Sequence, residues 1–480
     1  MQRRRPEPAV LAIDLGTSSV RTALFDALGK RIPGSGASRI YRVRHTVEHG
    51  AELDPAFLLR ATRGCLRQTR RLTNDAPVAV AGSGFWHSLL GLDRAGDPLT
   101  PVYIWADARG AQDARRLREE FDEHKIQQRT GCMLRPSFWP ARLRWLRRTR
   151  PKLFRSVTRW VSPAEWIFEK IWKVGGCSHS MASGTGLYNF ARRDWDDELL
   201  AACRLTRAQV GVLGDSVSGE GSIVFAAIGD GAASNLGSGA TSAGSVAINV
   251  GTSAAVRAIA TAGAPLPFGL FQFVVDQHRS LLGGAVSNAG NLRNWFLREL
   301  RLPVGEPELE RLLRTAGPGA ASLTILPFWV GERAPTWPEN LGGTVVGLSQ
   351  ATTAADLFRA GLAAVCNRLA DILEILEGSM GRAKKIIVSG GIVQSPASLQ
   401  LLADSLGRDL EVCVDQEASL RGAAVYALEH LRHRIAAPEL GKRIRHDPAR
   451  GERTRQQRSR QKALEDLLSV WSGTSTNSLG

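Results

Sequence analysis

Hydrophobic positions along the chain alternate between short runs and longer segments with helical spacing. Apolar runs bounded by turn residues predict strands at 10–15, 20–26, 78–82 and 89–93. Apolar positions three and four residues apart predict helices at 54–73, 108–121, 139–149, 162–172, 353–377 and 396–406. The run KKIIVSGG (384–391) is typical of a strand that enters a glycine turn. Strands mixed with crossover helices indicate an α/β fold.

One strand–turn–strand pattern occurs twice. VLAIDLGTSSVRTALFD (10–26) aligns without a gap with SVAINVGTSAAVRAIAT (245–261). The alignment places Asp14 on Asn249, Gly16 on Gly251, Thr17 on Thr252 and Ser18 on Ser253. We interpret this as a duplicated unit. It predicts two related domains, each opening with a hairpin whose Gly-Thr-Ser turn faces a common cleft.

The residue types of this turn suit phosphate binding. Glycine lets the backbone approach a ligand, and successive N–H groups with short hydroxyls cradle phosphate oxygens. Asp14, at the end of the first apolar run, suits Mg²⁺ held through water. Asn249 replaces it in the second copy, so we expect only the first half to hold the metal. An ordinary hairpin turn is the alternative for either loop taken alone.

Length and composition favour a multidomain globular protein. The chain has 480 residues, of which 43% are hydrophobic and 22% charged, which predicts two or more domains. We divide it into a basic N-terminal segment (1–8), an N-terminal domain (9–243), a C-terminal domain (244–437) and a basic polar tail (438–480).

Other features of the sequence predict where the protein is located and how its cysteines behave. The sequence has no apolar run long enough for a bilayer, and no hydrophobic signal region follows the basic start. We therefore expect a cytoplasmic protein without a membrane partner. The six cysteines are scattered, with no CxxC pair, which argues against a zinc site and a disulfide framework.

The chain is strongly basic, with a formal net charge of +16. This balance favours an anionic partner such as a nucleotide or an anionic metabolite. Much of the charge lies in arginine-rich blocks at 142–150 and 442–462, which we interpret as a solvated helix face and a mobile tail. No nucleic-acid-reading motif accompanies them, so we do not expect a nucleic-acid partner.

Six motifs in order carry a resemblance to a known family. They are AIDLGTSSVRTALFD (12–26), GFWHSLLGLDRAGDPLTPVYIWADAR (84–109), NVGTS (249–253), LPFWVGERAP (326–335), VSGGIVQSPASLQLLADSLG (388–407) and EASLRGAAVYAL (417–428). In this order they resemble the motifs of the FGGY carbohydrate kinases. The resemblance implies two ribonuclease-H/actin-like ATPase domains, with ATP and a sugar in the interdomain cleft.

Within that family, His87-Ser88 and WADAR (105–109) look most like gluconokinases. The resemblance implies ATP- and Mg²⁺-dependent phosphorylation of D-gluconate to 6-phosphogluconate. Xylulose or another polyol or ketose is the alternative substrate. A nucleotide-binding regulator that has lost turnover is the alternative of another class. The segment before Asp230 is shorter than the family's, and an arginine usual after 331–335 is missing. A homodimer is left open.

The resemblance also implies residue roles. Asp230 matches the family's catalytic base, although an aspartate there can also cap a helix. The expected sugar contacts are Trp86, His87, Trp105, Asp107, Arg109 and Gly231, although Arg109 can also simply pair with Asp107. The expected nucleotide contacts are Gly16, Thr17, Ser18, Gly251, Thr252, Ser253, Gly283, Gly284, Gly390, Gly391 and Gln394, and Asp14 is the expected metal ligand. We interpret Glu332-Arg333 as a structural ion pair between the domains.

Overall fold

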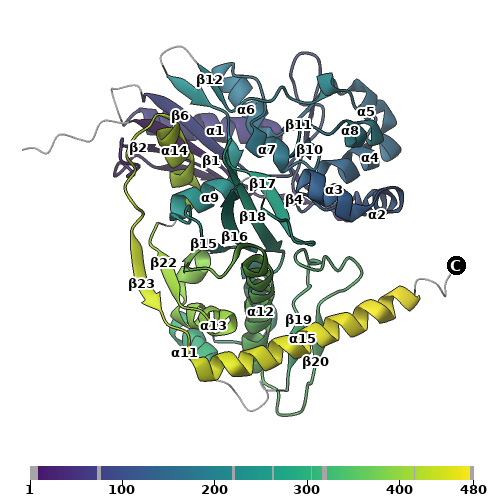
Figure 1. Ribbon diagram of the computed structural model, residues 1–480, viewed down its shortest axis with the longest axis vertical. Helices are drawn as coiled ribbons and strands as arrows, with labels where there is room; N and C mark the ends of the chain where they lie inside the picture. Colours follow the sequence, from purple (N-terminus) through teal and green to yellow (C-terminus); the bar gives the residue numbers. More distant parts are fainter. Residues whose placement is uncertain are drawn as a thin grey trace, which may run out of the picture.

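The protein is described here by a computed structural model that covers residues 9–72, 77–218, 222–261, 264–303, 305–315, 322–415 and 417–475. The basic segment 1–8 lies outside these residues. Figure 1 shows two lobes, each built around a mixed sheet with helices packed on it. This is the expected α/β architecture of two related domains.

The first sheet centres on the first of the two duplicated hairpins. β1 (Val10–Leu15) is antiparallel to β2 (Ser19–Phe25) and parallel to β6 (Ala79–Gly84). All six residues of β1 are buried, which explains its continuous apolar pattern. The sheet is completed by β3 (Ala37–Ile40), β12 (Ser216–Ser218), β13 (Ile223–Phe225) and β14 (Ile228–Gly229).

Helices and short strands surround this sheet. The helices are α1 (Pro55–Arg70), α2 (Ala111–Glu120), α3 (Glu123–Thr130), α4 (Trp139–Thr149), α5 (Pro151–Ser156), α6 (Pro163–Trp172), α7 (His179–Ser183), α8 (Asp197–Ala202), η1 (Arg207–Gln209) and α9 (Asp230–Ser238). The short strands are β4 (Arg44–His45), β5 (Ala51–Leu53), β7 (Leu90–Leu92), β8 (Val102–Tyr103), β9 (Arg159–Val161), β10 (Tyr188–Asn189) and β11 (Asp194–Trp195).

The second sheet repeats the pattern of the first. β15 (Ser245–Val250) is antiparallel to β16 (Ala254–Thr261) and parallel to β21 (Lys385–Ser389). The two hairpins differ in one respect: the first turn leaves Leu15 opposite Val20, whereas the second leaves Val250 opposite Ala254. The second turn is therefore one residue shorter, and the ungapped alignment slips by one position after Ser253.

The remaining elements of the second lobe flank this sheet. The strands are β17 (Phe271–Val274), β18 (Arg279–Val286), β19 (Thr324–Leu326), β20 (Thr344–Val346), β22 (Leu410–Cys413) and β23 (Leu440–Ile444). The helices are α10 (Gly290–Glu299), α11 (Glu306–Arg314), α12 (Ala354–Met380), η2 (Gly391–Gln394), α13 (Pro396–Leu406), α14 (Ala418–His430) and α15 (Pro448–Ser475).

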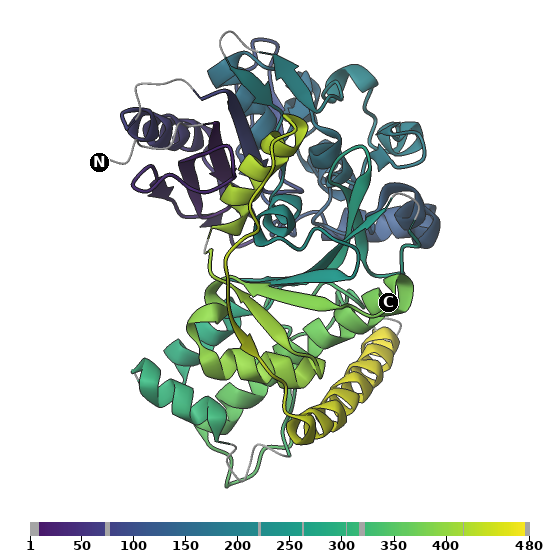
Figure 2. The ribbon, with the colours of Figure 1, turned by 60° about the vertical axis from the view of Figure 1, so that its left-hand side comes forward.

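One helix crosses from the second half of the chain to the first lobe. α14 packs on β1, β6 and α9, and its apolar residues from Leu420 to Leu428 belong to the first lobe's core (Figure 2). The crossing is close because glycines meet backbone: a Cβ on Gly237 would lie 1.7 Å from the Ala418 carbonyl oxygen, and one on Gly422 equally near that of Ala233. The linear division at 243/244 therefore does not coincide with the spatial one.

The segment 438–475 is folded, contrary to the expectation of a polar tail. β23 joins the edge of the second sheet, and α15 lies across α12 and α13 (Figure 1). Two kinds of contact hold α15 on α12: Arg458 pairs with Asp371 and Glu374, and the buried Glu465 pairs with Arg368. Basic residues that look solvated in the sequence thus have carboxylate partners that lie far away along the chain. Residues 476–480 lie outside the described part.

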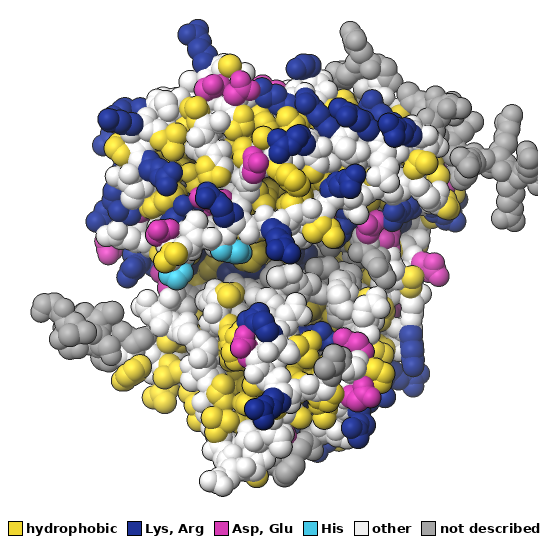
Figure 3. Space-filling view, turned by 180° about the vertical axis from the view of Figure 1, so that it is seen from behind, with side chains coloured by type: hydrophobic (Ala, Val, Ile, Leu, Met, Phe, Trp, Pro, Cys, Tyr) yellow, Lys and Arg dark blue, Asp and Glu magenta, His cyan; other side chains and the backbone are white. Residues whose placement is uncertain are grey.

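Three expectations, about membrane spans, cysteine pairing and surface charge, can be compared with the structure. Across the described ranges, no helix combines the length and apolarity needed to cross a membrane. The six cysteines are all buried and free, as their scattered positions predict. Figure 3 shows Lys and Arg side chains gathered over the upper lobe on the face opposite to that of Figure 1, as a basic composition implies.

Candidate functional site

Two cavities meet between the lobes and share three lining residues. The larger has a volume of about 410 Å³ and the smaller about 100 Å³. Asp230, Asn249 and Arg257 line both of them. Two adjoining cavities with charged residues at their junction suit two reactants that must meet there.

Glycines form much of the larger cavity. Gly251, Gly390, Gly391 and Gln394, all expected nucleotide contacts, line it. Gly390 follows β21 with φ +90° and ψ −170°, a conformation restricted to glycine, and a Cβ there would lie 2.5 Å from the Val250 carbonyl oxygen. The other residues that line the larger cavity are Arg21, Ser234, Ser389, Val393, Ala418 and Ser419. The wall therefore combines glycine backbone and small polar side chains, which suit phosphate and ribose groups, with charged side chains.

Asp14 lies at the end of β1, beside the larger cavity. Its Oδ1 accepts a hydrogen bond from Ser83 and its Oδ2 one of 3.0 Å from Ser419, and Arg21 Nη1 lies 3.8 Å from Oδ2. Within the described residues no group of three or more His, Cys, Asp or Glu side chains is placed to hold a metal. A single carboxylate oriented by hydroxyl groups fits Mg²⁺, which takes few protein ligands and keeps waters and phosphate oxygens.

Asp230 is the first residue of α9. The Gly231 N–H donates to its Oδ1 over 2.9 Å, and burial raises the pKa of its carboxyl group, while Arg257 opposes that rise. The N-cap residue is Gly229 and makes no side-chain capping bond. Asp230 is therefore not the N-cap residue, although its carboxylate accepts a first-turn N–H of α9, and it lines both cavities where they meet.

Arg257 is a site residue that the sequence analysis did not single out. It lies on β16, and burial lowers the pKa of its guanidinium while Asp230 raises it. Its guanidinium makes no hydrogen bond to another residue of the described ranges. A guanidinium that interacts with Asp230 only through charge keeps its N–H donors for an anionic ligand. The sequence signal that could have identified Arg257 is its position at the end of NVGTSAAVR (249–257), directly after the second Gly-Thr-Ser turn.

Aromatic rings and His87 form the smaller cavity. The His87 backbone has φ +65°, rare outside glycine, and its Nδ1 faces the Gly184 carbonyl oxygen. Burial lowers the pKa of His87 to about 3, so the ring is neutral. With Nδ1–H donating to Gly184, Nε2 is left as an acceptor for a ligand hydroxyl. Trp105, Phe138, Phe271, Phe273 and Trp337 supply apolar faces to the same cavity.

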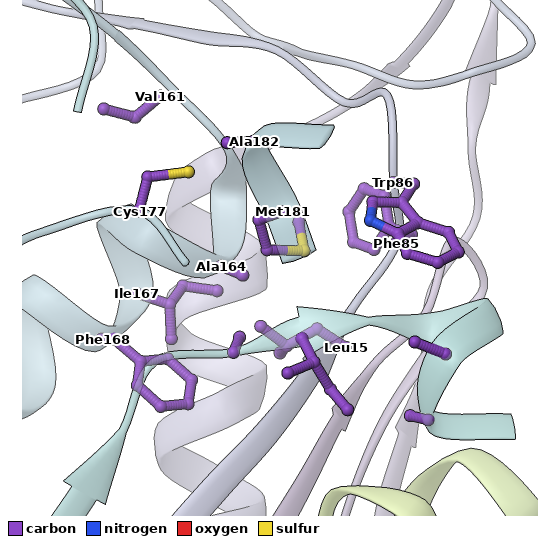
Figure 4. Packing of buried hydrophobic residues seen from close by; sticks show 14 of the residues in the cluster. Leu15, Phe85, Trp86, Val161, Ala164, Ile167, Phe168, Cys177, Met181 and Ala182 are labelled. Atoms are coloured by element: carbon purple, nitrogen blue, oxygen red, sulfur yellow. The ribbon is translucent and has the colours of Figure 1, made fainter. Parts of the chain in front are cut away.

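Trp86 forms a wall of the smaller cavity and is itself tightly held. Its Nε1 donates 2.9 Å to the Ser180 carbonyl oxygen, and Gly184 and Gly229 leave room for its ring. Figure 4 shows it beside Phe85, with Met181 of α7 nearby. The indole N–H is therefore used within the protein, and the ring offers a surface to a ligand.

Arg142 on α4 holds the loops around the smaller cavity. It is fully buried and donates to the backbone carbonyl oxygens of His87, Ile104 and Ser137, with a bond of 2.9 Å to Ile104. These carbonyls belong to the His87 loop, the residue before Trp105 and the segment before α4. One side chain thus fixes three cavity-lining segments, although the sequence marked it only as part of a basic block.

Several expected contacts lie outside the cavity linings. Arg109 pairs with Asp107 and, over 2.6 Å, with Glu52, so both residues are satisfied within the protein. Gly283 and Gly284 lie inside β18. A Cβ on Gly283 would lie 2.4 Å from the Val256 carbonyl oxygen, and Gly284 makes room for Ile372 of α12. Among described residues the linings also omit Gly16, Thr17, Ser18, Gly231 and Thr252.

The expected ion pair of Glu332 and Arg333 is replaced by separate contacts. Glu332 accepts hydrogen bonds from the N–H groups of Ser287 and Arg333, both in the same lobe. Arg333 donates to the Val286 carbonyl oxygen, and its guanidinium carbon lies 4.5 Å from the Trp105 ring centre. Arg333 also lines the smaller cavity, so it belongs to the site and links the lobes through an aromatic ring.

Comparisons with known proteins give one family and several similar proteins. Profiles described as the N- and C-terminal domains of the FGGY family of carbohydrate kinases match residues 9–237 and 242–429. A gluconokinase of Bacillus subtilis is 26% identical, and a xylulose kinase of Lactococcus lactis 27%; each match covers 87% of both chains. A crystal structure of gluconate kinase from Lactobacillus acidophilus superposes with a TM-score of 0.89 at 23% identity, covering 97% of this chain and 99% of that one.

Proposed function

The chain belongs to the FGGY family of carbohydrate kinases, and from that premise we propose that it phosphorylates the terminal hydroxyl of D-gluconate. Membership makes it an ATP-using sugar kinase with two actin-like domains. The observation that carries the finer proposal is the position of Asp230 and Arg257, which line both cavities. We assign the larger cavity to ATP and the smaller one to the sugar acid.

Asp230 acts as the general base in this proposal. Its carboxylate takes the proton of the attacking hydroxyl, whose oxygen forms a bond to the γ-phosphorus while the bond to ADP breaks. The group must be ionised to do so, and the positive charge of Arg257 favours the ionised form against the burial that disfavours it. Arg257 also lies where negative charge develops on the transferred phosphoryl group.

Asp14 would hold Mg²⁺ through water at the end of β1. The ion, when bound, neutralises charge on the β- and γ-phosphates. Ser83 and Ser419 orient the Asp14 carboxylate, and Ser419 comes from α14, which crosses from the second half of the chain. The metal site thus depends on both halves of the sequence.

The charges of the smaller cavity favour a sugar acid. Arg257 and Arg333 are its two cations, and Asp230 is the one carboxylate among the described residues that line it. A substrate carboxylate would add an anion beside these two guanidinium groups, in addition to Asp230 and to the Glu332 carboxylate that raises the pKa of Arg333. The Bacillus subtilis gluconokinase among the relatives adds support, and the Lactococcus lactis xylulose kinase keeps a ketose as the alternative.

ADP release with MgATP and gluconate, xylulose, ribulose or glycerol tests the proposal. We expect turnover with gluconate and a loss of about 10²–10⁴-fold in Asp230→Asn. Asp97→Asn, a change of the same kind at an exposed ion pair with Lys170, should keep full activity. Preference for a neutral sugar would overturn the gluconate assignment. ATP binding without turnover on any of the four would favour the regulator instead.

A further inference from the structure

A third cavity lies away from the cleft, in the second lobe beneath the C-terminal helix. It has a volume of about 350 Å³, and its lining comes from α11, α12, α13, α15 and the region of β19. It shares no lining residue with the two cavities between the lobes. Its size is in the range of small-molecule sites, and no step of the proposed reaction uses it.

The lining carries an excess of positive charge. Four arginines contribute to it, namely Arg314, Arg359, Arg450 and Arg453. Asp404 is the one carboxylate among the described lining residues. Asp404 is already engaged, because its Oδ1 accepts from Gln400 Nε2 and from the Asp447 N–H, both over 2.8 Å. Arg450 reaches its Oδ2 only at 4.0 Å. Arg450 also pairs with Asp447 over 3.3 Å, and Arg314 pairs with Glu310 over 3.6 Å, so two of the four arginines have carboxylate partners outside the lining.

Two of these arginines have no ion pair with a carboxylate in the described part of the chain. Arg359 is partly buried on α12. Burial lowers the pKa of its guanidinium, and the positive charges of Arg450 and Arg453 lower it further, whereas Asp404 raises it. Arg453 faces it from α15. Guanidinium groups held together in this way repel one another, and an anion between them relieves that repulsion.

The wall of the cavity also contains an unsatisfied buried acceptor. Asn367 of α12 is 2% exposed, and its Nδ2 donates a hydrogen bond of 3.1 Å to Gln461 Oε1. The Gln461 Nε2 in turn donates to the Ala364 carbonyl oxygen. The Asn367 Oδ1 has no hydrogen-bond partner within the described residues. A buried acceptor of this kind costs free energy unless a donor reaches it, and a ligand hydroxyl is such a donor.

We propose that this cavity binds a small organic phosphate that carries hydroxyl groups. Arg359 and Arg453 bind the phosphate from α12 and α15, because planar guanidinium groups match its oxygen atoms. Asn367 accepts a hydrogen bond from a hydroxyl group of the same ligand. The proposal does not rest on the identity of the sugar phosphorylated in the cleft.

Calorimetric titration of the full-length protein with ribose 5-phosphate tests this site. We expect saturable binding that becomes at least about tenfold weaker in Arg359→Gln and in Arg453→Gln. Arg455→Gln is the matched control, because Arg455 is on the same helix, pairs with Glu452 and does not line the cavity. It should bind as the unmodified protein does. Unfolding temperatures measured for every variant establish that each is folded.

Three outcomes would overturn the proposal. One is binding that Arg359→Gln and Arg453→Gln leave unchanged, or no binding at all. Another is equal weakening in Arg455→Gln, which would indicate only the general positive charge of α15. The third is that inorganic phosphate or ribose alone binds as tightly as ribose 5-phosphate, since neither combines the two groups that the cavity is proposed to recognise. Binding should also weaken as salt is raised.

Discussion

The guanidinium carbon of Arg333 lies 4.5 Å from the centre of the Trp105 ring, so a cation–π contact joins the two lobes at the smaller cavity. Arg333 is held from its own side by the Val286 carbonyl oxygen at 3.0 Å. Such contacts contribute about 2 kcal/mol when they are desolvated. This one closes the wall of the proposed sugar site and depends on a planar cation.

Replacing Arg333 by lysine should therefore weaken substrate binding. Lysine keeps the charge but loses the planar group, and we expect KM for the sugar acid to rise about tenfold with a smaller change in kcat. Steady-state kinetics measure both constants. Arg298→Lys, at an exposed position, is the control and should be neutral. An unchanged KM in Arg333→Lys would show that the Trp105 contact does not shape the site.

Arg142→Met should destabilise the protein and impair substrate binding together. The change leaves the carbonyl oxygens of His87, Ile104 and Ser137 without their buried donor. We expect the free energy of unfolding to fall by about 3 kcal/mol, because each buried acceptor left unsatisfied costs about 1–3 kcal/mol. Denaturant unfolding measures this loss. Arg144→Met on the same helix, where the pair with Glu120 is partly exposed, should cost much less.

Glu465 on α15 anchors the loop that carries Arg333 and Trp337. Its Oε2 lies 2.6 Å from Arg368 Nη1, and Arg368 in turn donates to the Ala334 carbonyl oxygen. Glu465→Gln leaves the buried Arg368 charge unbalanced, so we expect a loss of about 3 kcal/mol in unfolding free energy and a higher KM for the sugar acid.

The control for Glu465 is Glu452→Gln on the same helix, because its pair with Arg455 is exposed. There we expect less than about 0.5 kcal/mol and no change in KM. Equal effects of the two substitutions, measured by denaturant unfolding and steady-state kinetics, would contradict the anchoring role. They would leave α15 as a general stabilising element of the second lobe.

Glu165 on α6 should make stability depend on pH. Burial raises its pKa from 4.5 to about 7, so between these values the folded state keeps a proton that the unfolded chain has lost. The free energy of unfolding should therefore fall as pH rises through this window, by about 2 kcal/mol between pH 5 and pH 8.

Denaturant unfolding of the unmodified protein and of Glu165→Gln at about pH 5 and pH 8 measures this pH-dependent loss of unfolding free energy. Glutamine does not titrate, so the pH-dependent loss should disappear in the variant. Glu169→Gln, on the same helix and paired with the partly exposed Arg159, should retain it. A loss of the same size in Glu165→Gln would assign the pH dependence to other groups.

Local sequence patterns predicted much of what builds the cleft. Apolar periodicity and turn residues indicated the positions of three features: the repeated hairpins, the strand within 384–391 and the long helix within 354–380. Asp230 and His87, named from family motifs, line the smaller cavity between the lobes, and their roles stay predictions. These features rely on neighbours within a few residues, or on short motifs, so the linear sequence carries their signal.

Local patterns indicated the two hairpins at the centres of the sheets, the glycine turns and the polar groups available to the cleft. Tertiary structure decided which of those groups face a cavity. Arg109 is satisfied by Asp107 and Glu52, while Arg257 and Arg333 are brought to the site by strands and loops far from Asp230. Tertiary structure also decided that α14 crosses to the first lobe and that the basic C-terminal segment folds. The physical reason is that ion pairing and helix packing depend on partners distant in sequence, which periodicity does not encode.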